Sequence, residues 1–346
     1  MKEYLPWSEL TLNNELEKYK NGRLSILDIQ LGGGCNYNCT YCDSPDRKKE
    51  CITDLSYIRK LISLDADLID WIFVCGLGEP LFSTNKEKLL YILEICREYG
   101  IKCSVFTNGS LLDSQICSYI EKGILFPLVK VDSLSAEKVK QLYRTNNPNG
   151  NLSAVSTLFD IAKKTGTAYC SVGASIVPTR ANINEIPSIV ETCISNNVFP
   201  LIAELECAGL SIGDHYESLY LTREELQELK NTIQIQLGEE YKIPICPSVI
   251  SGIHITNEGI ISVDEVSGLS CPWYWLLNPK THNICSIKDI HSFKDADKQI
   301  IDYRNSVYKE LLPLAEEIEP YPFGGCGGNV RRLLFEYISI QKHIYS

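Results

Sequence analysis

The sequence contains no long apolar run, no excess of basic residues and few histidines, and each absence excludes a class of protein. No stretch of about 18 or more apolar residues occurs, so we expect no transmembrane helix and no membrane partner. The opening residues, Met1–Trp7, lack the charged and then apolar segments of a signal peptide, so we expect a cytoplasmic protein. Lysine and arginine number 33 against 44 aspartates and glutamates, and the net charge of −11 argues against a nucleic-acid partner. The five histidines form no pair at helical spacing, so we assign none of them to a metal.

The length of the chain limits the number of domains, and the cysteine content indicates what the cysteines do. The chain has 346 residues, of which 44% are apolar, enough for one large domain with an appendage or for two domains. It contains 15 cysteines, an odd number in a long chain without an export signal. Metal binding and buried thiols therefore explain the cysteines better than a disulfide framework does.

Three of these cysteines lie within eight residues, in the segment Cys35-x3-Cys39-x2-Cys42. The segment follows an apolar run, Leu24–Leu31, and the glycine triplet Gly32–Gly34. Three soft ligands suit an iron–sulfur cluster or a zinc ion, and a missing fourth ligand leaves one metal position open. The alternative is that the thiols are simply packed in a core, since free cysteine is often buried. The close spacing of three cysteines after a glycine-rich turn is not what packing in a core requires.

Apolar strands alternate with amphipathic helices along the first two thirds of the chain, the pattern of parallel βα units. The predicted strands are Leu24–Leu31, Trp71–Cys75, Lys102–Phe106, Leu125–Val131, Ala168–Val177 and Val198–Glu204. Stripes of apolar residues at helical spacing separate them, at Leu55–Ile62, Leu89–Cys96, Ile116–Ile120, Val155–Ala162 and Ile186–Cys193. Six strands with interleaved helices predict an α/β fold, a partial (β/α)6 barrel of the TIM type.

The cysteine segment, with the aromatic Tyr41 before its last cysteine, resembles the signature of the radical S-adenosylmethionine (radical SAM) superfamily. The resemblance implies that Cys35, Cys39 and Cys42 hold three irons of a 4Fe–4S cluster, and that the fourth iron binds S-adenosylmethionine. It also implies that one electron from the cluster splits the cofactor and yields a 5′-deoxyadenosyl radical, which abstracts a hydrogen atom from substrate. Flavodoxin or ferredoxin would be the expected reductant.

Other strand ends carry residues that match further elements of the family. Gly76-Leu77-Gly78-Glu79-Pro80 is similar to its Gly-Gly-Glu-Pro element, which meets the amino group of S-adenosylmethionine, and a turn of this composition also occurs in proteins without a cofactor. Active sites of barrel enzymes lie at the carboxyl ends of their strands, which favours the cofactor. By resemblance the cofactor-binding residues are Tyr41, Gly76, Gly78, Glu79, Asn108, Ser133 and Arg144. For Arg144 the alternative to cofactor binding is that this lone arginine is a solvated charge on a helix.

The predicted sixth strand ends in Glu204, Glu206 and Cys207. The two acids at this strand end are candidates to bind substrate or to remove a proton, and the alternative is that they are rim charges without a role. Cys207 is a candidate hydrogen-atom donor, because epimerising members of the superfamily use a cysteine in this way. Most isolated cysteines are inert. We name all three as candidate catalytic residues.

The last third of the chain carries a second cysteine pattern. Cys246, twelve residues and then Gly259 resemble the opening of the SPASM/twitch motif, but Asp264 stands where that motif has cysteine. The four candidate ligands of an auxiliary 4Fe–4S cluster are Cys246, Cys271, Cys285 and Cys326. Asp264 either replaces a ligand or marks a lost cluster, and structural zinc is a further alternative whose usual spacings are shorter. The other cysteines are expected to be buried thiols: Cys51, Cys75, Cys96, Cys103, Cys117, Cys170 and Cys193.

These patterns divide the chain into three expected parts. They are an N-terminal helical brace at 1–23, the radical SAM partial barrel at 24–207, and a small cysteine-bearing α+β extension of SPASM/twitch type at 208–346. Within the extension we expect a capped helix from Leu221 to Leu237 and a charged helix at Lys298–Ile318.

The resemblance leaves the substrate open. Relatives with such extensions mostly mature ribosomally made peptides by cross-linking or epimerisation, and others dehydrogenate or epimerise sugars and aminocyclitols in natural-product pathways. The 34 residues before Cys35 are too few for the leader-binding domain of many peptide maturases, which removes one argument for a peptide. We expect peptide maturation, with a sugar or aminocyclitol as the alternative. A non-catalytic zinc protein is the alternative from another class.

Overall fold

A single mixed sheet organises the described part of this computed structural model, which comprises residues 21–42, 44–74, 76–165, 171–203, 205, 210, 214–237, 252–265, 270 and 281–307. The sheet has nine strands in the order β6-β5-β4-β3-β2-β1-β7-β8-β9. The strands are β1 Leu24–Ile29, β2 Ile69–Val74, β3 Lys102–Thr107, β4 Leu125–Lys130, β5 Gly173–Ile176, β6 Phe199–Ile202, β7 Gly252–Ile255, β8 Ile260–Asp264 and β9 Thr281–Ser286.

The first six strands are parallel to one another and follow in chain order, as in a partial barrel. The sheet does not close, because β6 and β9 remain its two edges. The predicted α/β partial barrel is therefore confirmed. The helices are α2 Leu55–Asp65, α3 Ser83–Tyr99, α4 Ser114–Glu121, α5 Ala136–Tyr143, α6 Pro148–Thr165, α7 Ile186–Ser195, α8 Asp214–Leu219, α9 Arg223–Leu237 and α11 Phe293–Ser306.

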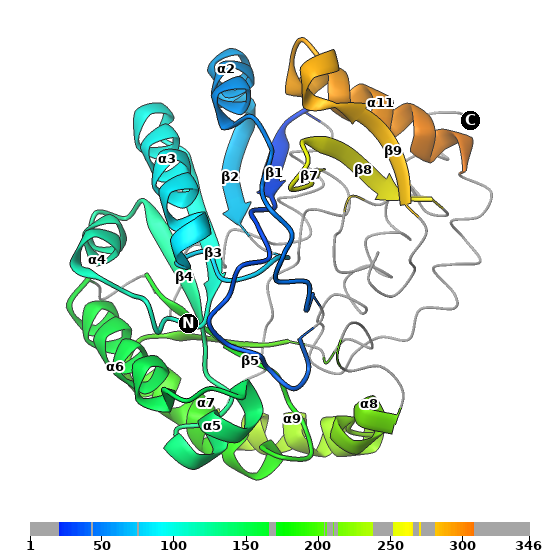
Figure 1. The fold of residues 1–346 in the computed structure, drawn as a ribbon. Coiled ribbons are helices and arrows are strands. Elements are labelled where there is room, and N and C mark those ends of the chain that lie inside the picture. Colours follow the sequence, from blue (N-terminus) through cyan, green and yellow to red (C-terminus); the bar gives the residue numbers. More distant parts are fainter. Residues whose placement is uncertain are drawn as a thin grey trace.

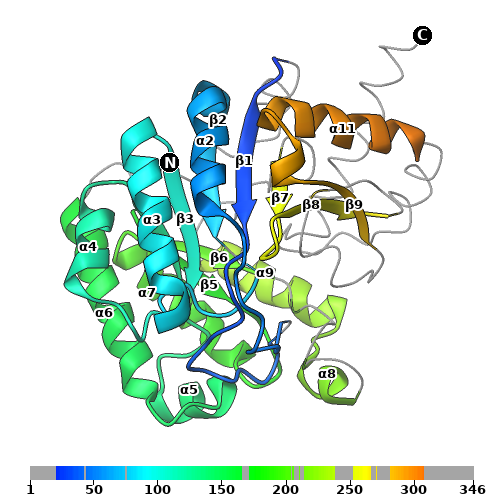
Figure 2. The same ribbon diagram turned by 45° about the horizontal axis from the view of Figure 1, so that its top comes forward.

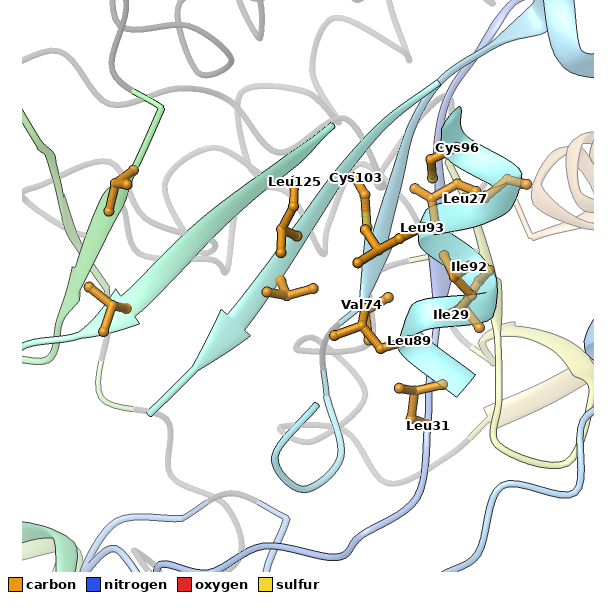
Figure 3. Close-up of a cluster of buried hydrophobic side chains, with 14 of the residues drawn as sticks. Leu27, Ile29, Leu31, Val74, Leu89, Ile92, Leu93, Cys96, Cys103 and Leu125 are labelled. Carbon is orange, nitrogen blue, oxygen red and sulfur yellow. The ribbon is translucent and has the colours of Figure 1, made fainter. Parts of the chain in front are cut away.

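The helices cover one face of the sheet, as Figure 1 shows for α2, α3, α4 and α6 beside strands β1–β4. Their apolar stripes bury side chains against alternate residues of the strands. Figure 3 shows Leu89, Ile92, Leu93 and Cys96 of α3 facing Leu27 and Ile29 of β1 together with Val74 and Cys103. The opposite, inner face holds a separate cluster that includes Ile26, Trp71, Phe73, Leu128 and Phe199.

The C-terminal strands continue the barrel sheet directly. β7 pairs with β1 in parallel, with Asp28 opposite His254, and β8 and β9 follow in antiparallel order. Gly259, at φ +78°, lies in the turn that joins β7 to β8. Figure 1 shows these strands and α11 lying beyond β1, on the side away from β2. The sequence did not reveal this junction, because strand alternation does not specify a partner strand.

Two helices were predicted in the C-terminal part, and their bounds can be compared with those of α9 and α11. The helix at Leu221–Leu237 is confirmed as α9, and the Thr222 hydroxyl accepts from the backbone N–H of Glu225 at 3.3 Å in its first turn. The helix predicted to begin at Lys298 begins earlier, since α11 spans Phe293–Ser306, and residues 308–318 of the prediction lie outside the described residues. Ser292 caps α11 by accepting from the N–H of Asp295 at 3.1 Å, and this cap starts the helix earlier than its charged stretch indicated.

Most of the expected buried thiols are confirmed. Cys51, Cys96, Cys103 and Cys193 are buried and Cys117 is half-buried. Cys75, Cys170 and the N-terminal brace up to residue 20 lie outside the described residues. Within the described residues, no helix has both the length and the apolar character needed to cross a membrane.

Asp54 caps the N-terminus of α2, the first helix after the cysteine segment. Its carboxylate accepts from the N–H groups of Ser56 at 3.1 Å and Tyr57 at 3.2 Å, and from the Ser56 hydroxyl. These bonds, first that of the Ser56 hydroxyl, lower the pKa of Asp54.

Replacing this cap with Asp54→Ala should lower the free energy of unfolding by about 1 kcal/mol at pH 7. Because the pKa of Asp54 is lower in the folded state, the stabilisation is present above the unfolded pKa of about 3.9 and is lost as the pH falls through the folded value. Urea unfolding at pH 7 and at pH 3 measures this difference. Asp54→Asn, which keeps the acceptor, is the control, and an equal loss in both variants would contradict the capping role.

Candidate active site

The candidate site lies where the strands β1–β4 end and the loops that follow them meet. The cysteine segment leaves β1 and passes beside α5, as Figure 2 shows for the blue loop. The N–H of Asn38 donates to the carbonyl of Tyr143 at 3.1 Å, and that of Thr40 to the carbonyl of Leu142 at 2.8 Å. Carbonyls in the last turn of a helix have no partner within the helix. The C-terminal end of α5 therefore anchors the cysteine segment, and the rings of Tyr37 and Tyr143 stack at 5.8 Å.

The three predicted cluster ligands lie on this loop as free, half-buried thiols. Burial raises the pKa of Cys35 and raises that of Cys39 to about 12, and the charge of Cys42 raises both further. Lys130 lowers the pKa of Cys39, and Arg47 lowers that of Cys35. Metal coordination deprotonates a thiol outright, so a bound cluster would supply the charge that makes these groups thiolates.

The donor set fits a 4Fe–4S cluster with one open iron. Three soft ligands that form no disulfide lie close enough for their charges to act on one another. Within the described ranges, no three His, Cys, Asp or Glu side chains already converge as a finished metal site. The fit therefore rests on the identity of the donors and on the loop that carries them.

The loop after β2 packs directly on the glycine triplet that precedes the cysteines. Gly78 has φ +59°, and a Cβ there would lie 2.4 Å from the carbonyl oxygen of Gly32 and 2.5 Å from that of Gly34. The N–H of Glu79 donates to the carbonyl of Gly34 at 2.8 Å. Gly78 is thus required both for its backbone conformation and for the close approach of two loops. The structure thus packs Gly78 and Glu79 against the glycine triplet that precedes Cys35.

Asn85, in the first turn of α3, holds these two loops together and was missed by the sequence analysis. Its side chain is fully buried; Nδ2 donates to the carbonyls of Gly32 at 2.8 Å and Glu79 at 3.0 Å, and Oδ1 accepts from the N–H of Gly32 at 3.0 Å. No local pattern reports a contact between residues 53 positions apart. The residue type was the sole signal, because a buried amide can satisfy several backbone groups at once.

The Glu79 carboxylate forms its hydrogen bonds within the protein. It is 2% exposed and accepts from the Thr107 hydroxyl at 2.5 Å, the N–H of Asn108 at 2.7 Å and the N–H of Leu81 at 3.1 Å. Burial raises the pKa of Glu79, and these three donors act in the opposite direction. The side chain joins the β2 loop to the β3 turn. A contact of Glu79 with the cofactor amine, as the resemblance implies, stays a prediction.

Glu79→Gln should therefore lower the free energy of unfolding by about 1–3 kcal/mol. Either orientation of the glutamine side chain places its NH2 group against a backbone N–H, where the carboxylate had an acceptor oxygen. Glu79→Ala leaves all three donors unpaired and should cost more. Urea unfolding of the metal-free protein measures both changes, and Glu87→Gln on the surface of α3 is the matched control. Equal stability of the two glutamine variants would contradict this bracing role.

Asn108 ties the β3 turn to the cysteine segment. Its Nδ2 donates to Oδ1 of Asn36 at 3.0 Å, and its Oδ1 accepts from the Ser110 N–H at 2.9 Å. Asn36 in turn donates to the Ser110 hydroxyl oxygen at 2.8 Å. The described structure thus shows the side chain of Asn108 positioning Asn36, next to the first cysteine.

Ser133 and Arg144 are not brought together with the cysteines in the same way. Ser133 is buried, and its hydroxyl donates to Glu185 at 2.5 Å, which also pairs with Lys138. Arg144 is exposed and ends α5 with φ 44°. The ribose and carboxylate contacts that the resemblance implies for these two residues stay predictions.

Asp132, beside Ser133 at the end of β4, is a second residue that the sequence analysis did not single out. It is fully buried; it accepts from the Tyr41 hydroxyl and from the Val177 N–H at 2.7 Å, and Lys130 Nζ lies 3.5 Å away. Lys130 Nζ also lies 4.6 Å from the centre of the Tyr41 ring. Tyr41, between two candidate ligands, is thereby fixed to β4 and to the end of β5.

Several predicted site residues lie outside the described residues: Glu204, Glu206, Cys207, Cys246, Cys271 and Cys326. Asp264 and Cys285 are described. Cys285, on β9, packs against the apolar core on the helix-covered face, and burial raises its pKa to about 11. Asp264 is buried on the other face, because its neighbour Val263 belongs to that core. The two side chains thus point to opposite faces of the sheet.

Comparison with known proteins agrees with this geometry. The family described as the Radical SAM superfamily matches residues 29–193. GTP 3′,8-cyclase of Marinobacter nauticus is 30% identical over 220 residues, 60% of each chain, and that of Chlorobaculum tepidum is 28% identical over 183 residues, 51% of this chain and 52% of the relative. This chain therefore spans little more than half the length of these curated relatives.

Solved structures share the fold. SuiB of Streptococcus suis bound to the precursor peptide SuiA superposes with a TM-score of 0.60 at 15% identity, over 92% of this chain and 74% of SuiB. Native anSMEcpe with bound AdoMet gives a TM-score of 0.60 at 13% identity, over 92% of this chain and 98% of that protein. The family implies a 4Fe–4S cluster with S-adenosylmethionine, and the alternative of a non-catalytic zinc protein is thereby rejected. Residues 29–193 of this chain therefore contain a radical SAM domain, and the similar proteins are enzymes.

Proposed function

We propose that this protein abstracts a hydrogen atom from a ribosomally made peptide, as a step of cross-linking or epimerisation. When bound, the cluster and S-adenosylmethionine supply the one-electron cleavage that yields the 5′-deoxyadenosyl radical. The observation that carries the proposal is the fold similarity to SuiB and anSMEcpe, which extends over 92% of this chain and so beyond residues 29–193. Structures of both proteins hold a bound peptide.

The roles of this chain's residues follow from their positions. Cys35, Cys39 and Cys42 would hold the cluster, and flavodoxin or ferredoxin would reduce it. The backbone of Gly76–Glu79 lies beside them and would face the cofactor amine. Glu79, Asn85 and Asp132 orient the loops through buried hydrogen bonds. Such preorganisation holds reactive groups in place and limits the access of water.

Part of the inner face of the sheet, on strands β1, β7 and β8, is acidic, which disfavours a strongly anionic group there. On its β1–β7–β8 side lie Asp28 and His254, with Oδ2 and Nδ1 3.1 Å apart, and Asp264, all of them buried. A nucleoside triphosphate is the second candidate, because the curated relatives include GTP 3′,8-cyclases. Acidic side chains repel a triphosphate, whereas they suit the amide and ammonium groups of a peptide. A sugar or aminocyclitol remains the alternative, since its hydroxyl and amine groups also suit acids.

We also propose the finer roles named from the sequence for residues outside the described ranges. Cys207 would return a hydrogen atom to the substrate, and Glu204 and Glu206 would bind it or accept a proton. A second 4Fe–4S cluster would be held by Cys246, Cys271 and Cys326 and by a fourth ligand. Cys285 is the candidate that the sequence offers for this position, and it packs partly buried against the apolar core.

Cys326→Ala should lower the iron content of the reconstituted protein from about eight to about four per chain, because each 4Fe–4S cluster carries four irons. Iron and sulfide analysis after anaerobic reconstitution measures this. Cys285→Ala, made in parallel, tests whether that residue is a ligand. Unchanged iron in Cys326→Ala would remove it from the ligand set.

The substrate proposal is tested by stimulated cofactor cleavage. Reconstituted enzyme with S-adenosylmethionine and dithionite is given the peptide fraction of the source cells, with and without prior proteinase treatment. We expect 5′-deoxyadenosine formation to rise with the intact fraction and to return to the uncoupled rate after proteolysis. A rise that survives proteolysis, or one produced by GTP alone, would overturn the peptide substrate.

A further inference from the structure

A short segment, residues 46–53, crosses the start of the cysteine loop and is held there on both sides. The N–H of Gly33 donates to the carbonyl of Lys49 at 2.7 Å, and a Cβ on Gly33 would lie 1.9 Å from the carbonyl oxygen of Asp46. At its other end, the N–H groups of Ile52 and Thr53 donate to the carbonyl of Asn257, at 2.8 and 3.2 Å. The segment is thus fixed between the glycine triplet and the β7–β8 turn.

Arg47, on this segment, reaches back to the cysteine loop. Its Nη2 lies 3.6 Å from Sγ of Cys42 and donates to the carbonyl of Tyr37 at 3.0 Å. Its Nη1 donates to the carbonyl of Ser44 at 3.4 Å. The guanidinium therefore spans the loop from before the second cysteine to after the third, and one of its contacts is a candidate ligand sulfur.

Within the part of the chain that the structure describes, the guanidinium of Arg47 forms no ion pair. Among the described residues, no carboxylate lies within 4.0 Å of its guanidinium, whereas Lys86, Lys138 and Arg180 each have such a partner. A full positive charge is therefore directed at a ligand sulfur. By contrast, the next residue, Lys48, is exposed.

We propose that Arg47 sets the reduction potential of the cluster, by donating a hydrogen bond to the Cys42 sulfur and placing a positive charge beside it. Reduction adds one electron and no proton, so the negative charge on the cluster and its thiolates grows by one. Hydrogen bonds and positive charge at the sulfurs stabilise the reduced form more than the oxidised form, and so raise the potential. Arg47 is a positioning residue that acts through the cluster. The inference rests on the proposed function, because it requires the cluster to be present.

The test compares Arg47→Gln with Lys48→Gln, which removes the same charge one residue away. Both proteins are reconstituted, their iron is counted, and the reduced cluster signal is followed by electron paramagnetic resonance in a mediated dithionite titration. In Arg47→Gln we expect the ratio of reduced to oxidised cluster at a fixed potential to fall about tenfold. This corresponds to a midpoint potential lower by about 59 mV for a one-electron couple. Lys48→Gln should match the wild type.

Arg47→Lys keeps the charge but loses the planar fork of donors, so its midpoint should fall between those of wild type and Arg47→Gln. If Arg47→Gln retains no iron, Arg47→Lys takes its place in the comparison. An unchanged midpoint potential in Arg47→Lys would then overturn the inference. Equal midpoints for Arg47→Gln and Lys48→Gln, with normal iron, would overturn it while leaving the proposed function intact. A wild-type protein that assembles no cluster would overturn both.

Discussion

Replacing Cys35, Cys39 and Cys42 together by alanine is expected to abolish the formation of 5′-deoxyadenosine from S-adenosylmethionine. The three thiols lie on one loop, and a cluster that keeps an iron free for the cofactor needs all three. The triple variant removes every ligand of this loop. All three side chains are half-buried, and Cys35 and Cys39 also pack against the apolar cluster that includes Tyr37 and Tyr143. Anaerobic reconstitution followed by chromatography of the reaction products measures the loss.

Cys117→Ala is the control for this experiment. Cys117 is a half-buried thiol on α4, away from the cysteine loop, and its removal should leave product formation unchanged. Persistence of 5′-deoxyadenosine in the triple variant would mean that the cofactor is cleaved elsewhere. The assignment of the cysteine loop as the cofactor centre would then be wrong.

Gly78→Ala should have the second largest effect, by separating two loops that touch. The new Cβ would overlap the carbonyl oxygens of Gly32 and Gly34, which precede the first cysteine. Its φ of +59° adds a backbone cost of about 1–2 kcal/mol for any residue with a side chain. We expect binding of S-adenosylmethionine to weaken by about tenfold or more, equivalent to about 1.4 kcal/mol.

Gly123→Ala separates the two causes. Gly123 has φ +66°, close to that of Gly78, but a Cβ there would meet no atom within 4 Å. It should carry the backbone cost alone and bind the cofactor normally. Equilibrium binding of S-adenosylmethionine to the two reconstituted variants decides the matter, and equal affinities would show that the close approach of the loops is unimportant.

The sequence predicted what depends on local pattern. Alternating apolar runs are enough to place β1–β4 within a residue or two, and the cysteine spacing is readable because its residues are close along the chain. β5 and β6 are shorter than predicted, at Gly173–Ile176 and Phe199–Ile202. Apolar residues that flank a strand cannot be told from the strand itself by periodicity.

The contacts that build the site were beyond sequence reasoning, because they join distant residues. Asn85 meets Gly32 across 53 positions, and Tyr41 meets Asp132 across 91. Ser133 was named by resemblance to the family, and the structure pairs it with Glu185, 52 residues away. A residue type can be read from a sequence, but the direction of its side chain follows only from the packing around it.

The measurement that tests the account most directly is anaerobic reconstitution of the full chain with iron and sulfide, followed by addition of S-adenosylmethionine and dithionite. The account predicts at least about four irons per chain, the content of one 4Fe–4S cluster, together with formation of 5′-deoxyadenosine. Tightly held zinc, no cluster and an intact cofactor would contradict it.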